Sequence, residues 1–343
     1  MALDVRRAAP LAPAAGSVPL IETRNLTKLY QVKAGWITKR LSWLSAVEDV
    51  SLSVDRGETV GLVGESGSGK STLARLLVQL IEPTRGEVRY DGHNISALSR
   101  GERRRFRRNA QIIFQDPYSS LNPRHTVETI IGEGIQGSGR GRKQKRLAEL
   151  LDLVSLTPDA LQRYPHEFSG GQRQRIGIAR ALAVDPEFLV LDEPVSALDV
   201  SVQSKILNLL RDLKDALNLT YVFISHDLSV VRHMADRVAV MYLGQLVELA
   251  SRRELFANPL HPYTQALLSA MPMVGGPVQS QGRIRLAGEI PSAIGIPKRC
   301  RFATRCFRPV ERSWQEVPSM QEAADSHYVA CFNYAPLSQL QQR

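Results

Sequence analysis

A phosphate-binding loop is the part of the sequence whose residue types and spacing point most directly to chemistry. Residues 64–71 read GESGSGKS and match the pattern G-x-x-x-x-G-K-[ST]. The glycines of this pattern let successive backbone N–H groups turn inward around a phosphate, and the helix that follows adds the positive end of its dipole. Lys70 would place its charge on the β- and γ-phosphates of a nucleotide, and the Ser71 hydroxyl would ligate Mg²⁺. The predicted nucleotide contacts are Gly64, Glu65, Ser66, Gly67, Ser68, Gly69, Lys70, Ser71 and Thr72.

An acidic pair, Asp192 and Glu193, directly follows the apolar run FLVL at 188–191. A carboxylate at the C-terminal end of a buried strand faces the crevice where α/β folds bind nucleotides. Asp192 would then hold Mg²⁺ through its water shell, and Glu193 would accept a proton from an attacking water. Such a pair is often only solvent-exposed, but its occurrence in a chain with a phosphate loop favours the catalytic interpretation.

Around these residues, short apolar runs alternate with stretches of helical period, which predicts a parallel sheet with helical crossovers. Residues 60–63 are expected to form the strand that leads into the loop. Residues 71–81 are expected to form the helix after it, stopped by Pro83. Further strands are predicted at 111–114, 188–191 and 221–224, a helix at 202–217, and a hairpin at 237–250 with Gly244 at its turn.

Composition suggests three further segments. Residues 1–18 are rich in Ala and Pro and lack a long apolar stretch, so we expect a disordered tail. Strand patterns vanish at 116–168, which indicates an inserted helical lobe, and we assign the helix-like segments 102–108 and 143–154 to it. Prolines and glycines punctuate the sequence after Asn258, so residues 259–343 are predicted to extend a main domain at 19–258.

Together with these motifs, FSGGQ at 168–172 resembles the signature of the nucleotide-binding subunits of ABC transporters. The resemblance implies ATP hydrolysis and an α/β fold of the P-loop NTPase type, with an antiparallel β subdomain, an inserted α-helical lobe and a small C-terminal extension. In this family the signature opens a helix whose N-terminus caps the γ-phosphate bound by the opposite subunit. That role would fall to Ser169, Gly170, Gly171 and Gln172, and Ser169 is a good N-cap. The family usually has Leu where Phe168 stands, an exchange of one apolar residue for another.

The remaining motifs of the family map onto single residues. Gln115 resembles the glutamine that contacts Mg²⁺ and the lytic water, and His226 the histidine that contacts the γ-phosphate, so both join Glu193 as catalytic candidates. Asp199 in SALD resembles the aspartate of the D-loop, a further nucleotide contact. Tyr30 resembles the aromatic residue that stacks on adenine, with residues 33–44 interpreted as an insert between it and the next strand. A lone Gln or His is most often structural, and only the order and spacing of the motifs reverse that expectation.

Four longer stretches resemble the oligopeptide/dipeptide importers within this family: 115–124, 163–176, 192–203 and 258–272. This resemblance covers residues 21 to 272. It implies a peripheral subunit on the cytoplasmic face of the inner membrane, partnered by a second ATPase subunit (a paralogue), two transmembrane permease subunits and an extracytoplasmic solute-binding protein. Importers of glutathione, nickel or an oligosaccharide remain alternatives to a peptide importer. A soluble nucleic-acid ATPase of the superfamily is another, but the stretch between Gln115 and Ser169 is too short for the coiled-coil or zinc-bearing insertions of that class.

The chain carries a formal net charge of +10, which permits an anionic partner. Much of the excess lies in two blocks, at 100–108 and 140–146. We interpret them as solvated helix faces and expect no nucleic-acid partner, because the charges are not interleaved with a series of stacking aromatic residues as in single-strand binders. No apolar run approaches the ~20 residues needed to cross a bilayer.

Three cysteines, Cys300, Cys306 and Cys331, lie in the C-terminal extension. Some members of the importer subfamily bind an iron–sulfur cluster there with four cysteines. Ser313 stands where the third of these normally falls, and clusters of this kind require four thiolates. The sequence leaves two interpretations open, a cluster with a substitute ligand or three ordinary thiols.

Overall fold

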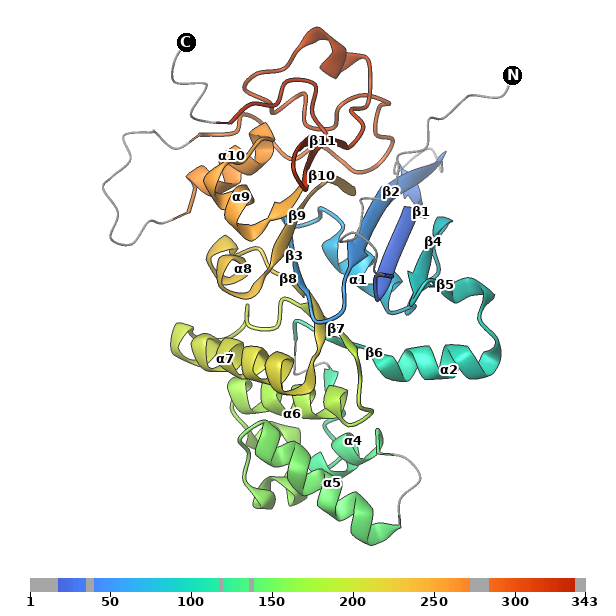
Figure 1. The fold of residues 1–343 in the computed structure, drawn as a ribbon, viewed down its shortest axis with the longest axis vertical. Helices are drawn as coiled ribbons and strands as arrows, with labels where there is room; N and C mark the ends of the chain where they lie inside the picture. Colours follow the sequence, from blue (N-terminus) through green and yellow to red (C-terminus); the bar gives the residue numbers. More distant parts are fainter. Residues whose placement is uncertain (1–17, 35–39, 117–119, 136–138, 272–283, 337–343) are drawn as a thin grey trace.

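A computed structural model describes residues 18–34, 40–116, 120–135, 139–271 and 284–336 (Figure 1). The predicted tail at 1–18 lies outside these residues except for Val18. In the described part of the chain, no helix is long and apolar enough to span a membrane. The helices are α1 (Lys70–Leu77), α2 (Arg100–Asn109), α4 (Val127–Gly132), α5 (Arg140–Leu153), α6 (Gly170–Leu182), α7 (Val200–Leu217), α8 (Leu228–Met234), α9 (Arg252–Ala257) and α10 (Pro262–Ser269).

The strands of the described residues form two sheets, and the fold confirms the predicted α/β class. A larger sheet has the order β11-β12-β10-β9-β3-β8-β7-β6, and a smaller one the order β2-β1-β4-β5. The strands are β1 (Ile21–Ala34), β2 (Arg40–Val54), β3 (Thr59–Val63), β4 (Arg85–Tyr90), β5 (His93–Asn94), β6 (Ala110–Ile113), β7 (Phe188–Asp192), β8 (Thr220–Ile224), β9 (Arg237–Tyr242), β10 (Gln245–Ser251), β11 (Gln321–Ala324) and β12 (His327–Val329).

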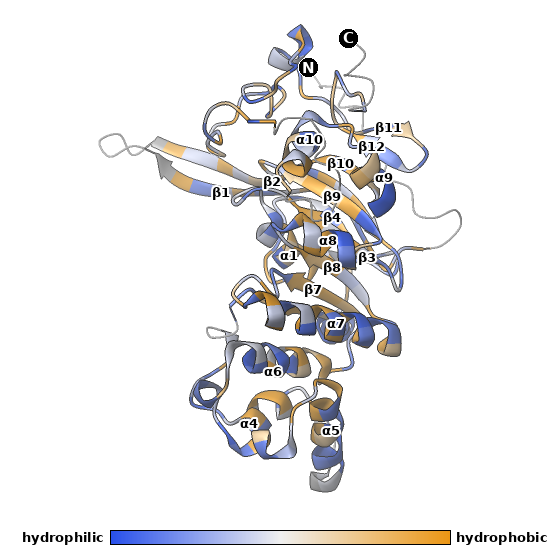
Figure 2. Ribbon diagram, turned by 90° about the vertical axis from the view of Figure 1, so that its left-hand side faces the viewer, coloured by the Kyte–Doolittle hydropathy of each residue, from blue (hydrophilic) through white to orange (hydrophobic). Residues whose placement is uncertain are grey.

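The centre of the larger sheet is parallel and buried on both faces. Strand β3 pairs in parallel with β8 and β9, and β7 pairs in parallel with β6 and β8. Successive side chains of a strand point to opposite faces, so Leu189 and Leu191 join one hydrophobic cluster while Phe188 and Val190 join the other. Double burial explains why these strands read as unbroken apolar runs, coloured as hydrophobic in Figure 2.

The smaller sheet corrects one prediction from the sequence. The range 33–44 is wrong as an insert before the next strand, because its described residues 33–34 and 40–44 belong to β1 and β2, while residues 35–39 lie outside the described structure. Strands β1 and β2 form a long antiparallel hairpin in which Tyr30 pairs with Leu44 and Lys33 with Leu41. Figure 2 shows this hairpin projecting from the body of the molecule. The described side chains Tyr30, Leu41 and Trp43 of its outer part are exposed, so the sequence there carries no clear alternation of apolar and polar residues.

Two helical predictions are also wrong in part. Helix α1 ends at Leu77 rather than at residue 81, because Gln79 takes a left-handed conformation (φ 56°) and Leu80 N–H turns back to the Arg75 carbonyl. Leu80 is therefore 55% exposed and not part of the helix face. The segment 102–108 does not belong to the helical lobe: it lies in α2, before β6, where Phe106 packs against Tyr90.

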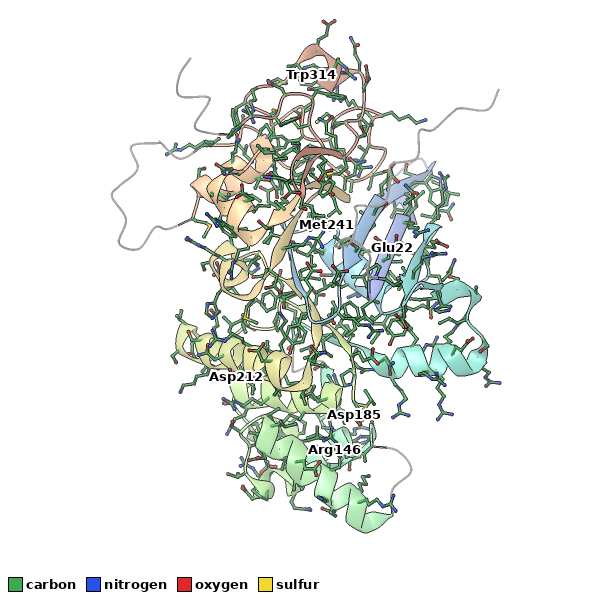
Figure 3. The ribbon with its side chains drawn as sticks, viewed as in Figure 1. Glu22, Arg146, Asp185, Asp212, Met241 and Trp314 are labelled. Atoms are coloured by element: carbon green, nitrogen blue, oxygen red, sulfur yellow. The ribbon has the colours of Figure 1, made fainter. Side chains whose placement is uncertain are left out.

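The helical lobe between β6 and β7 contains α4, α5 and α6 (Figure 1). Apolar residues of all three helices share one cluster, which includes Ile130, Leu147 and Ile176. The ion pair between Arg146 on α5 and Asp185 after α6, 2.5 Å long, links two parts of the lobe at its surface (Figure 3). The lobe is therefore one packed unit that includes the signature helix α6.

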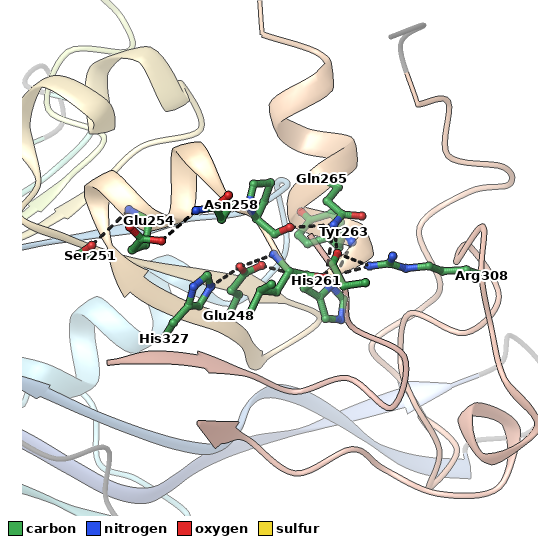
Figure 4. Close-up of polar contacts among 12 residues, drawn as sticks. Glu248, Ser251, Glu254, Asn258, His261, Tyr263, Gln265, Arg308 and His327 are labelled. Atoms are coloured by element: carbon green, nitrogen blue, oxygen red, sulfur yellow. Dashed lines mark hydrogen bonds and ion pairs between the residues drawn. The ribbon is translucent and has the colours of Figure 1, made fainter. Parts of the chain in front are cut away.

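A buried polar network joins the C-terminal extension to the larger sheet (Figure 4). Strand β12 pairs with β10, and His327 on β12 contacts the fully buried Glu248 on β10 through Nε2 and Oε1, 2.8 Å apart. The same carboxylate accepts the backbone N–H groups of Leu260 and His261. His261 in turn accepts the N–H of Tyr263 on Nδ1 and caps α10. The network satisfies a carboxylate that would be costly to bury alone.

Acid should weaken this joint through His261. Burial, assisted by the nearby Arg308 charge, lowers the pKa of His261 from 6.5 to about 3. Below pH 6.5, His261 binds a proton in the unfolded chain but stays neutral in the folded chain. The stability present above this pH is therefore lost as the pH falls towards 3. For His261→Asn, which keeps a capping acceptor, we expect the free energy of unfolding to fall by about 1.2 kcal/mol less between about pH 6 and pH 5 than in the parent. Urea unfolding at the two pH values measures this difference. If the free energy of unfolding changed between the two pH values by the same amount in the variant as in the parent, the assignment would be wrong.

Candidate nucleotide site

A pocket of about 860 Å³ lies where the phosphate loop meets the β1–β2 hairpin. Its volume is in the range of small-molecule sites. Many of its lining residues are site residues predicted from the sequence. They come from segments far apart in the chain, and the fold brings them together. The lining comprises Tyr30, Leu44, Ala46, Ser66, Gly67, Gly69, Lys70, Ser71, Thr72, Gln115, Glu193, His226, Leu243, Ile290, Pro291 and Ala293.

The phosphate loop connects β3 to α1 and depends on glycine at two close approaches. A Cβ atom at Gly64 would lie 2.2 Å from the Met241 carbonyl oxygen, and one at Gly69 would lie 2.1 Å from the Ala46 carbonyl oxygen. Both residues also have positive φ, 152° and 102°, which L side chains rarely adopt. Larger residues would push the loop away from β9 and β2. Glycine at 64 and 69 therefore sets the shape of the phosphate cradle.

Lys70 lies within the curve of the loop. Its ammonium group donates to the carbonyl oxygens of Gly64 and Glu65, at 2.7 and 3.0 Å. Burial lowers the pKa of Lys70, and the carboxylates of Glu193, Asp192 and Glu65 oppose that shift. The surrounding acidic groups thus favour the charged form of Lys70. Its ammonium can then form charge-assisted hydrogen bonds with the oxygens of a triphosphate.

Ser71 and Asp192 bring oxygen atoms together at the start of α1. The Ser71 hydroxyl donates to Asp192 Oδ1 over 3.1 Å. Burial raises the pKa of the Asp192 carboxyl, the Ser71 hydrogen bond opposes the shift, and the neighbouring Glu193 adds to it. Hydroxyl, carboxylate and amide oxygens are the donors that Mg²⁺ prefers, so Ser71, Asp192 and Gln115 suit this ion.

Glu193 receives polar groups from two other strand ends. Its Oε2 atom accepts Gln115 Nε2 at 3.0 Å and lies 3.1 Å from His226 Nδ1. Glu193 adopts φ 48°, and its N–H donates to the Ile224 carbonyl at the end of β8. That turn carries the carboxylate across the carboxyl ends of the parallel strands, into the pocket. A carboxylate held in this way can take a proton from a water bound beside it.

Comparison with known proteins agrees with this geometry. The family described as "ABC transporter" matches residues 47–196, and "Oligopeptide/dipeptide transporter, C-terminal region" matches 247–312. The oligopeptide transport ATP-binding protein AppF of Bacillus subtilis is 49% identical over 331 residues, 94% of this chain and 99% of that protein. This chain is an ABC transporter ATP-binding subunit of the oligopeptide/dipeptide type. The dipeptide transport ATP-binding protein DppF of Haemophilus influenzae is 47% identical, over 92% of this chain and 97% of its own.

A solved structure supports the same family assignment for the ATPase core. The ATP-binding cassette MJ0796, in a dimeric post-hydrolysis state with ADP and Pi, is 30% identical and superimposes with a TM-score of 0.59. The match covers 68% of this chain and 99% of that one. The chain is therefore an ABC ATPase and binds ATP.

The signature of this ABC subunit lies away from its own pocket. Within the described structure, none of Ser169–Gln172 lines the pocket, and Figure 1 shows α6 on the lobe side of the sheet. Ser169 and Gln172 form a capping box, with N–H to side-chain distances of 3.0 and 3.3 Å. A Cβ atom at Gly171 would lie 2.4 Å from a methyl carbon of Val202, so this glycine lets α6 pack closely on α7. Asp199 caps α7 by accepting the Val202 N–H, a hydrogen bond that lowers the pKa of its carboxyl.

Sequence reasoning missed several residues of the pocket wall. Leu44 and Ala46 come from β2, and Leu243 from the turn before β10. Ile290, Pro291 and Ala293 come from the C-terminal extension. No local signal marks these residues as site residues, because their position depends on how distant backbone segments pair.

The thiols of the extension do not fit a four-thiolate cluster. Within the described residues, no three His, Cys, Asp or Glu side chains are placed to hold a metal ion. The hydroxyl of Ser313 already accepts the Val310 N–H at 3.2 Å. Burial raises the pKa of all three thiols, that of Cys331 to about 11. Three thiols and one serine hydroxyl are one thiolate short of the four that such a cluster requires.

We expect protein purified under anaerobic conditions to contain no iron or acid-labile sulfide above background. Because the thiol pKa values are raised, alkylation by iodoacetamide should be slow near neutral pH and accelerate up to about pH 11. The urea-unfolded chain, whose thiols have ordinary pKa values, is the control. Iron in near-equal amount to protein, or alkylation of the folded chain as fast as that of the unfolded chain, would contradict this.

Proposed function

We propose that this ABC subunit hydrolyses ATP to drive the import of peptides through partner permeases. The observation that carries the proposal is the single pocket that gathers Lys70, Gln115, Glu193 and His226 on the face of a fold shared with solved ABC ATPases. The names of the relatives, an oligopeptide and a dipeptide transport protein, support peptides as the solute class.

The proposed reaction is the attack of water on the γ-phosphorus, with breakage of its bond to the bridging oxygen of ADP. Glu193 removes the proton of the attacking water, and Gln115 and His226 orient the carboxylate and the water. Lys70 neutralises the β- and γ-phosphate oxygens from within the loop. Ser71, Asp192 and Gln115 would hold Mg²⁺, which supplies further positive charge to the phosphates when bound. Tyr30 would stack on the base.

A second ATPase subunit would complete the site. Ser169–Gln172 lie outside their own pocket, and the N-terminus of the 13-residue helix α6 presents N–H groups suited to an anion. We therefore place the signature and Asp199 of this chain at the γ-phosphate bound by its partner. The dimeric state of the related cassette MJ0796 supports the pairing of two such subunits.

The complete assembly would contain this chain, a paralogous ATPase subunit, two transmembrane permeases and an extracytoplasmic solute-binding protein. The chain would lie on the cytoplasmic face of the membrane as a peripheral subunit. Closure of the two ATPases on ATP, and reopening after hydrolysis, would move the helical lobe near Gln115. That lobe is the natural contact with the permeases, because it links the signature helix to the strand end that carries Gln115.

Glu193→Gln tests the base assignment. We expect the variant to bind ATP as the parent does and to lose at least ~100-fold in turnover, because the amide cannot accept the proton of water. Phosphate release and equilibrium ATP binding measure the two effects. Glu311→Gln, an exposed glutamate of the extension, serves as the matched control and should retain the parent rate. Hydrolysis at the parent rate by the Glu193 variant would rule out its role as base.

The composite site can be tested in the complex of both ATPase subunits. Lys70→Ala should abolish ATP binding at the loop of this chain, because it removes the charge on the phosphates. Ser169→Arg should preserve that binding and impair hydrolysis at the loop of the partner. A photo-crosslinking ATP analogue, quantified on each subunit, distinguishes binding at the two sites. Ser169→Thr, which keeps the helix cap, is the control. If Ser169→Arg instead removed labelling of its own chain alone, the head-to-tail arrangement would be wrong.

A further inference from the structure

A short segment of the C-terminal extension lies along the β1–β2 hairpin as an added strand-like edge. The Ser45 N–H donates to the Ala293 carbonyl at 3.0 Å, and the Gly295 N–H donates to the Trp43 carbonyl at 3.2 Å. Between these bonds Leu44 and Ile294 form an antiparallel bridge. Backbone bonds on both sides of the bridge determine which residues of the segment face the pocket.

This pairing gives the pocket an apolar end. Ile290, Pro291 and Ala293 line it with Tyr30, Leu44 and Ala46, whereas the phosphate loop, Gln115, Glu193 and His226 line the polar part. Tyr30 and Ile290 are 37% and 45% exposed, so both have apolar surface that a ligand can cover. A nucleotide has the same division, a charged triphosphate and a flat, weakly polar base.

The extension is also tied to the phosphate loop itself. The guanidinium of Arg305 contacts both carboxylate oxygens of Glu65, at 2.7 and 3.1 Å, and only 8% of Arg305 is exposed. The hydroxyl of Tyr263 accepts the backbone N–H of Glu65 at 2.8 Å. Arg301 reaches Glu48 on β2 and the carbonyl of Leu243, which lines the pocket. The extension therefore contacts the site at the loop, at the hairpin and at the pocket wall.

We propose that the C-terminal extension forms part of the base-binding site, with Ile290, Pro291 and Ala293 covering the base that Tyr30 stacks upon. The inference rests on the ATP-binding part of the proposed function. Since the segment contacts both the ligand and the hairpin, nucleotide binding and docking of the segment stabilise each other. An event that displaces the extension would then lower the affinity of the chain for ATP.

Ile290→Ser in the full-length chain, in a Glu193→Gln background that prevents hydrolysis, tests the wall. We expect the Kd for ATP to rise about tenfold, because part of the apolar surface no longer gains from covering the base. The Kd for inorganic tripolyphosphate, which has no base, should stay unchanged. Val317→Ser is the matched control: Val317 is an apolar residue of the same extension, 44% exposed, outside the residues that line the pocket, and its variant should bind both ligands like the parent.

A second measurement tests the reciprocal effect. Hydrogen exchange at the amides of Ser45 and Gly295 should slow on addition of ATP to the Glu193→Gln protein, and much less on addition of tripolyphosphate. Unchanged ATP affinity in Ile290→Ser, or equal weakening of ATP and tripolyphosphate, would overturn the inference while leaving the ATPase assignment intact. Failure of the parent chain to bind ATP at all would overturn the proposed function and this inference with it.

Discussion

The phosphate loop must bring backbone N–H groups close to a triphosphate, and the surrounding architecture serves this requirement. Several negative charges must be met at close range by N–H groups and one ammonium, and the loop can supply them only if it curves tightly. Gly64 and Gly69 permit that curve because any Cβ there would collide with the carbonyl oxygens of Met241 and Ala46. The loop is thus held from outside by two different sheets, through β9 and β2.

The remaining chemistry follows from the parallel sheet. Strands β6, β7 and β8 end at one edge, and Gln115, Glu193 and His226 follow those ends directly or within a few residues. Because hydrogen bonds fix the spacing of the strands, the strands themselves bring the three side chains into contact. The core that supports them is apolar on both faces, so the polar site rests on a rigid base.

The sequence could predict this polar half of the site well. Loop, acidic pair and strand ends are local patterns, and the strands at 188–191 and 221–224 are nearly the ones observed. It failed where structure depends on distant pairing. Nothing in the sequence around residues 40–44 shows that they continue a hairpin with β1, because Leu41 and Trp43 are exposed, and nothing in residues 290–295 shows that they bond to β2. The end of α1 was missed for a different reason: an ordinary glutamine, Gln79, adopts the left-handed conformation that Gly usually provides.

Strand β12 has a further consequence for the larger sheet. Without it, the outward side of β10, a strand whose residues 246–250 are all buried, would present unpaired N–H and C=O groups next to apolar side chains. Such an edge is a template for pairing with other chains and for aggregation. The described sheet instead closes on β11, a strand of only four, mostly exposed residues. The C-terminal extension that lines the nucleotide pocket thus also covers an edge prone to aggregation. A chain truncated before the extension would lose part of the pocket wall and the cover of this edge together.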